Sequence, residues 1–136
     1  MLRDMALNAA LSAALCVACS PATPSIDAGR VLYQANGCAG CHGRSGRGDG
    51  PLAATLPSKP IDFRDVWLFK RGASETAIAK TLAQGVSIDH PIPELHSTHH
   101  QLLMPKFDHL TETERRSIAR YVISMRTDID HGRVQP

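Results

Sequence analysis

The sequence predicts an all-α fold of three to five short helices. Three segments, at about residues 26–35, 74–84 and 111–125, combine helix-start signals with apolar residues at helical spacing. Residues 43–60 are rich in glycine and proline, which favours a wrapped loop over regular structure. A short cysteine- and histidine-containing stretch lies between the first helix and this loop. We expect the helices to be arranged around that stretch.

Two cysteines three positions apart, with a histidine directly after the second, occur at Cys38-Ala39-Gly40-Cys41-His42. This pattern is the attachment signature of a c-type haem. Each thiol can form a thioether with one haem vinyl group, and one turn of chain between the thiols matches the separation of the two vinyls. The next residue then projects onto the iron, so His42 is the expected proximal ligand. The predicted fold is therefore one of short helices wrapped around one covalently bound haem.

The same cysteine spacing also occurs in zinc sites, thioredoxin-like redox pairs and structural disulfides. A zinc ribbon needs a second pair of ligands, and the other two cysteines, Cys16 and Cys19, lie in a leader-like segment. A thioredoxin-like motif follows an apolar strand, which residues 33–37 do not provide. The haem interpretation is favoured because the sequence lacks the second ligand pair of a zinc ribbon and the apolar strand of a thioredoxin-like motif.

The first 25 residues have the character of an export signal followed by a spacer. An alanine- and leucine-rich run ends in small residues that suit cleavage, so residues 1–18 are expected to be a signal peptide. The end of this run also resembles a lipoprotein box, in which Cys19 would carry the lipid. Residues 19–25 are a predicted flexible spacer. Either route leads to the periplasm or the extracytoplasmic membrane surface, with membrane contact only through a lipid at Cys19.

The formal net charge of +2 is not the footprint of a nucleic-acid-binding protein. Aromatic residues make up only 4% of the chain, so the polypeptide alone would build a modest core. A haem would supply much of the missing apolar bulk.

The first two long helices have identifiable ends. Ser25 is a candidate N-cap for the first helix, and Asn36-Gly37 ends it just before the cysteines. Residues 62–68 are expected to form a short helical turn. Ser74 is the expected N-cap of the next helix, and Gly85 terminates it.

The last helix has the clearest signals. Thr111 and Glu114 form a capping box. The predicted buried stripe consists of Ile118, Tyr121, Val122 and Met125, and the predicted solvated side of Arg115, Arg116 and Arg120. Residues 127–136 are a predicted loose polar tail after a domain that spans residues 26–126.

Met104 is the expected second axial ligand of the iron. It is the only methionine between the leader and the last helix, and Pro105 stiffens the chain after it. A thioether stabilises ferrous iron, so a His/Met pair raises the reduction potential. The alternatives are that Met104 only fills core space, or that a histidine replaces it as a ligand.

A histidine-rich segment precedes Met104. Pro91 and Pro93 bracket its start, and residues 94–103 could form a short helix. His96, His99 and His100 would then share a face. This segment is a solvated loop, a secondary metal site at these three histidines, or a source of an iron ligand.

The chain resembles the class I, single-haem bacterial cytochromes c over nearly all of residues 27–126. The resemblance is carried by Gly29 to Tyr33, by Cys38 to His42, by Gly48-Asp49-Gly50-Pro51, by Met104-Pro105 and by Ile118 to Met125. It implies that Gly29 lets the first and last helices cross closely, with Tyr33 and Tyr121 nearby. It also implies that the Pro51 carbonyl accepts a hydrogen bond from His42 Nδ1, and that Trp67 borders a haem propionate.

These features predict a one-electron carrier rather than an enzyme, either on its own or as the haem subunit of a larger oxidoreductase. Its partners would be other redox proteins, bound transiently. The basic residues Lys59, Lys70, Arg71, Lys80 and Lys106 either ring the docking face or are isolated surface charges. The competing functions are a haem enzyme or gas sensor with a labile distal ligand, and a histidine-rich metal-binding module that also carries a haem.

Overall fold

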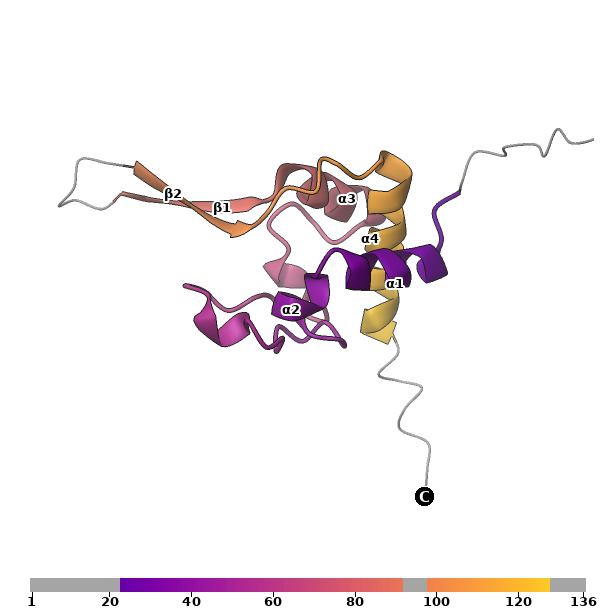
Figure 1. Cartoon of the computed structure of the whole chain (residues 1–136), viewed down its shortest axis with the longest axis horizontal. Coiled ribbons are helices and arrows are strands. Elements are labelled where there is room, and N and C mark those ends of the chain that lie inside the picture. Colours follow the sequence, from indigo (N-terminus) through magenta and orange to yellow (C-terminus); the bar gives the residue numbers. More distant parts are fainter. Residues whose placement is uncertain (1–22, 92–97, 128–136) are drawn as a thin grey trace, which may run out of the picture.

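The computed structural model describes residues 23–91 and 98–127 (Figure 1). The helices in these residues are α1 (Ile26–Ala35), α2 (Cys38–His42), α3 (Glu75–Gln84) and α4 (Glu112–Thr127). Two 3-10 turns, η1 (Ala53–Thr55) and η2 (Val66–Leu68), interrupt the loop between α2 and α3, and a hairpin of β1 (Val86–Pro91) and β2 (Thr98–Met104) precedes α4. The predicted, mainly helical fold is confirmed.

The helix ends follow from local chemistry, as the sequence predicted. The hydroxyl of Ser25 accepts a hydrogen bond from the Ala28 amide at 3.1 Å, and that of Ser74 accepts one from Ala77 at 3.2 Å. At α4, the Thr111 amide donates to Glu114 at 2.7 Å, and the Glu114 amide donates back to the Thr111 hydroxyl at 3.3 Å. These bonds satisfy backbone groups that lack a partner within the helix.

Helices α1 and α4 cross closely, and a glycine permits the approach (Figure 1). A Cβ atom added to Gly29 would overlap the carbonyl oxygen of Ser117 on α4. The aromatic rings of Tyr33 and Tyr121 meet edge to face beside this crossing, with centroids 5.4 Å apart. The role expected for Gly29 is therefore what the structure shows.

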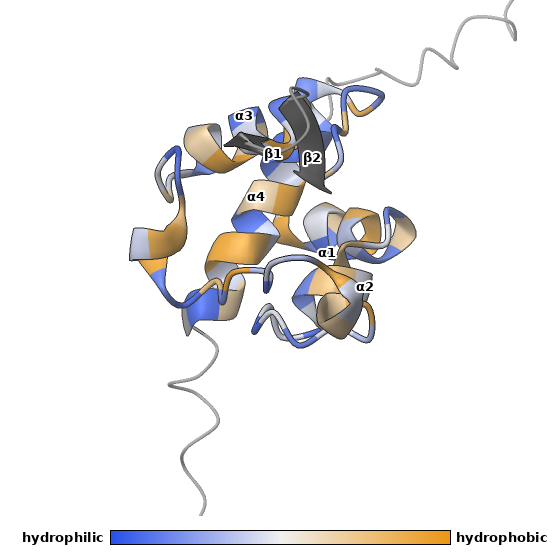
Figure 2. Cartoon of the chain, turned by 90° about the vertical axis from the view of Figure 1, so that its left-hand side faces the viewer, coloured by the Kyte–Doolittle hydropathy of each residue, from blue (hydrophilic) through white to orange (hydrophobic). Residues whose placement is uncertain are grey.

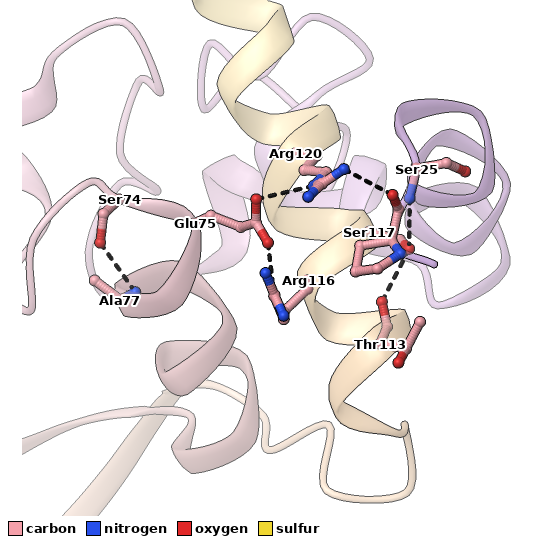
Figure 3. Close-up of polar contacts among 9 residues, drawn as sticks. Ser25, Ser74, Glu75, Ala77, Thr113, Arg116, Ser117 and Arg120 are labelled. Carbon is pink, nitrogen blue, oxygen red and sulfur yellow. Dashed lines mark hydrogen bonds and ion pairs between the residues drawn. The ribbon is translucent and has the colours of Figure 1, made fainter. Parts of the chain in front are cut away.

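The basic side of α4 is partly exposed, as predicted, with the Arg116 side chain 40% and the Arg120 side chain 41% exposed, but both arginines also bind neighbouring segments. Arg116 Nε donates to Glu75 of α3 at 2.6 Å, and Arg120 Nε donates to the other oxygen of the same carboxylate at 2.9 Å (Figure 3). Arg120 also donates to the Pro24 carbonyl at 2.8 Å, and the Ser25 amide donates to Ser117 Oγ at 3.2 Å. The sequence pattern of α4 could not predict these partners, because they lie on other segments of the chain. These bonds tie α3 and the start of the chain to α4.

The hairpin corrects the expectation of a helix over residues 94–103. Its strands are antiparallel, with His90 opposite His99 and Asp89 opposite His100 (Figure 1). Residues 98–103 therefore belong to a strand, and the shared helical face proposed for His99 and His100 does not exist. His96 lies outside the described residues. Periodicity failed here because strand pairing depends on residues distant in sequence.

The core lies where α1, α3 and α4 meet, and Figure 2 shows hydrophobic residues along α4 and along the segments around it. Its buried members are Tyr33, Phe63, Ile78, Leu82, Phe107, Leu110, Ile118, Ala119, Val122 and Met125. All of the predicted stripe on α4 except the partly buried Tyr121 belongs to this core. Among the helices of the described residues, none has the length and apolar character needed to cross a membrane.

Replacing Gly29 by alanine should destabilise the fold. Alanine favours an isolated helix over glycine by about 1 kcal/mol, but the overlap with Ser117 should outweigh this gain and cost about 1–3 kcal/mol net. Urea unfolding measures the change. Val31→Ala on the exposed side of α1, where the side chain is 64% exposed, is the matched control and should change stability little. A Gly29→Ala variant as stable as the parent would contradict the close crossing.

The stability supplied by Glu75 should depend on pH. Burial raises the pKa of its carboxyl, but the hydrogen bonds from Arg116 and Arg120 outweigh burial and hold the pKa below its usual range. The stabilisation is thus full above the ordinary glutamate pKa of about 4.3 and is lost as the pH falls through the lowered value. Glu75→Gln should therefore lower the free energy of unfolding at pH 7 by roughly 1 kcal/mol, and the difference should shrink towards pH 3. Asp108→Asn, at an exposed carboxylate, is the control, and a loss from Glu75→Gln that does not depend on pH would disprove this role.

Candidate functional site

The short helix α2 carries the cysteine–histidine motif, and the following loop holds it in place. The Gly48 amide donates to the His42 carbonyl at 2.9 Å, the Gly50 amide to Cys41 at 3.2 Å, and the Leu52 amide to Gly40 at 2.8 Å. A Cβ on Gly50 would overlap the carbonyl oxygens of this helix, so the loop can approach only with glycine there. The carbonyls that a five-residue helix leaves unpaired are thus satisfied by residues 48–52.

Tyr33 of α1 fixes the other end of the same turn. Its buried hydroxyl donates to the Gly43 carbonyl at 2.7 Å, directly after His42. Burial raises the pKa of Tyr33 well above its usual range, so the hydroxyl remains a donor at any physiological pH. The cysteine–histidine motif is therefore fixed on both sides by hydrogen bonds within the polypeptide.

A cavity of about 310 Å³ opens beside α2. Residues of α1, α2, η2, α3, both strands and α4 line it, and most of these are apolar. Cys38, Cys41, His42 and Met104 all contribute to its wall. The structure thus gathers the four residues with the strongest haem signals in the sequence around one cavity.

His42 is in the form that a metal ligand needs. Burial lowers the pKa of the imidazole, which the neighbouring Ile61 backbone only partly offsets, so the ring is neutral at pH 7. The ring stacks on Phe63, with centroids 4.7 Å apart. Its Nδ1 atom is buried and has no hydrogen-bond partner. The bond that the resemblance implied between Nδ1 and the Pro51 carbonyl is therefore not formed in this structure, and Pro51 is exposed.

The two thiols of α2 are not joined in a disulfide. Burial raises the pKa of Cys38 to about 11, so this thiol is uncharged at neutral pH. Within the described residues, no group of three or more histidine, cysteine and acidic side chains could hold a metal ion. A thiol that stays protonated at neutral pH is a poor thiolate ligand for a metal ion.

Some of the other predicted site residues line the cavity and others do not. Trp67 is 91% exposed and is absent from the lining, so the structure does not bring it to His42 or Met104. Lys59, Lys70 and Arg71 line the cavity, whereas Lys80 and Lys106 do not. Among the described residues, the charged side chains of the lining are all basic. The backbone of His99 and His100 lies in β2.

Phe63 is the main site residue that the sequence analysis missed. It stacks on His42, packs against Tyr33 and Phe69, and lies directly over Gly46. Its amide donates to the Gly46 carbonyl at 2.8 Å. The available signal was an aromatic residue close to a glycine- and proline-rich loop in a chain with only three phenylalanines.

A family model described as Cytochrome c matches residues 26–126. The chain belongs to the cytochrome c family. Membership implies a covalently bound c-type haem and haem-based electron transfer. The residues present fit that group: two thiols that are not joined in a disulfide, an imidazole whose buried nitrogen has no partner among the described residues, and a thioether share an apolar cavity.

A solved structure supports the assignment. The chain is similar to a chain of the reducing HAO-like protein complex of Kuenenia stuttgartiensis, with 32% sequence identity and a TM-score of 0.59. The similarity covers 78% of this chain and 47% of that chain, so the present sequence spans about half the length of its structural relative. No functionally curated protein matches the sequence closely.

Removing the Tyr33 hydroxyl should destabilise the turn that directly follows His42. Tyr33→Phe leaves the buried Gly43 carbonyl with only its longer bond from the Gly46 amide at 3.4 Å, which should cost about 1 kcal/mol of unfolding free energy. Tyr121→Phe makes the same chemical change at the neighbouring, partly buried ring, for which the structure shows no hydroxyl hydrogen bond, and should cost less. Denaturant unfolding of both purified variants tests the difference, and equal losses would show that the Gly43 bond has no special role.

Proposed function

We propose that this protein is a one-electron carrier with a single c-type haem, attached through Cys38 and Cys41 and ligated by His42 and Met104. The observation that supports it most is the shared cavity, because residues up to 66 positions apart converge on one apolar wall. When bound, the haem supplies a ferric/ferrous couple. The chain binds it, excludes water and holds both axial positions, so no substrate needs to reach the iron.

The side chains have separate tasks in this proposal. The two thiols anchor the haem, and the neutral His42 is ready to ligate without losing a proton first. Met104 is the last residue of β2, paired with Val86, and Pro105 follows it at the cavity wall. A soft thioether favours the ferrous state and raises the reduction potential. His42 Nδ1 still needs an acceptor, and the predicted Pro51 carbonyl, one residue beyond the Gly50–Cys41 bond, is the candidate.

The cellular setting follows from the same proposal. Residues 1–18 would direct export, after which covalent haem attachment is completed, and a lipid at Cys19 would hold the carrier at the outer face of the membrane. The folded domain would span residues 26–126. Other redox proteins would bind transiently at the cavity edge, where Lys59, Lys70 and Arg71 lie. The similar chain in a redox protein complex is compatible with a role as the haem subunit of a larger oxidoreductase.

Spectroscopy of the exported protein tests the ligand set. The reduced-minus-oxidised spectrum should show a c-type haem, and the ferric protein should show the weak absorption near the red edge of the visible spectrum that marks thioether ligation. Met104→Ala should abolish that absorption and let carbon monoxide bind without denaturant. His99→Ala, on the same strand, should change neither property.

Two other results would support a different function or a different ligand. Ready carbon monoxide binding by the unmodified protein would replace the carrier by a haem enzyme or gas sensor. Loss of the thioether absorption on His99→Ala rather than Met104→Ala would make a histidine the second ligand.

A further inference from the structure

Arg126 is an arginine in the last turn of α4 with an unusual environment. Its Nη1 donates to the Ala73 carbonyl at 2.9 Å, and its guanidinium carbon lies 4.6 Å from the centroid of the Phe69 ring. Its Nε and Nη2 atoms are buried and have no hydrogen-bond partner among the residues that the structure describes. Buried guanidinium groups ordinarily have their donors paired, so this exception calls for an explanation.

The positive charge of Arg126 is not neutralised by any carboxylate of the described residues. Four other arginines differ from it: Arg116 and Arg120 share Glu75, Arg64 pairs with Asp62, and Arg30 lies near Asp27. Burial lowers the pKa of Arg126, but a guanidinium starts so high that it stays protonated. The Phe69 face and the C-terminus of α4 stabilise the cation, yet neither carries a full negative charge.

The charge lies directly behind the wall of the cavity. Phe69, which carries the guanidinium on its face, is itself a lining residue. Phe69 meets Phe63 at a centroid distance of 6.0 Å, and Phe63 stacks on His42. The apolar rings of Phe69 and Phe63 therefore lie between Arg126 and His42, where they screen a charge less than water does.

We propose that Arg126 sets the reduction potential of the site from behind Phe69. The inference rests on the proposed haem function. Ferric haem carries one more positive charge than ferrous haem, so a buried cation nearby disfavours the ferric state and raises the potential. Because the medium between them is apolar, added salt should weaken the effect little.

Redox titration of the exported holoprotein tests this role. Arg126→Gln should lower the midpoint potential, so that the ferric-to-ferrous ratio at a fixed applied potential rises severalfold. The shift should persist at high ionic strength. Arg126→Lys keeps the charge and should retain most of the parent potential. Arg30→Gln removes one charge from a side chain that is 63% exposed, so its effect should be small and should vanish in high salt.

The outcomes separate charge from packing. An unchanged potential in Arg126→Gln, with the axial-ligand spectrum intact, would overturn the proposal. A potential in Arg126→Lys as low as in Arg126→Gln would also overturn it, because packing rather than charge would then be responsible. If the glutamine variant does not assemble, Arg126→Met fills similar space without charge and should show the same loss. Failure of the proposed function would look different, since the unmodified protein would then have no reversible haem couple at all.

Discussion

The rest of the structure depends on the fixed position of the short helix α2. A helix of five residues has no stability of its own, yet α2 must present two thiols and an imidazole to the same cavity. The polypeptide solves this by pairing the carbonyls of α2 with amides of residues 48–52 on one side and by binding Gly43 through Tyr33 on the other. The crossing of α1 and α4 at Gly29 positions Tyr33, so the scaffold and the site are joined through one buried hydroxyl.

The remaining helices and the end of the hairpin complete the cavity. Helix α3 is anchored to α4 through Glu75, and it contributes Ile78 and Leu82 to the wall. The end of β2 brings Met104 to the same space, 62 residues beyond His42 in the sequence. Phe63 and Phe69 form an aromatic layer that places Arg126 behind the site. A small chain with few aromatic residues thus uses most of them around one apolar space.

Local chemistry explains what could be predicted from the sequence. The caps at Ser25, Ser74 and Thr111 involve residues three apart, so the pattern alone identified α1, α3 and α4. The site motif was equally local, and the match of residues 26–126 to the cytochrome c family agrees with it. Met104 was identified as a candidate because few other soft ligands exist in the chain.

Long-range contacts explain what could not be predicted. Strand pairing between residues 86–91 and 98–104 depends on both segments at once, and a single-segment pattern suggested a helix instead. The ion pairs of Arg116 and Arg120 were not predicted because their partner, Glu75, lies more than 40 positions earlier. Trp67 is exposed rather than at the cavity, and its predicted contact with a propionate is untested.

The central claim is that Cys38 and Cys41 carry a covalently bound haem. Extraction of the purified, exported protein with acidified organic solvent tests it most directly, with intact mass measured before and after. We expect the colour and the added mass of one haem to stay with the polypeptide, and to be lost when both cysteines are replaced by serine. A colourless protein, or pigment that passes into the solvent and leaves the bare chain mass, would contradict the account.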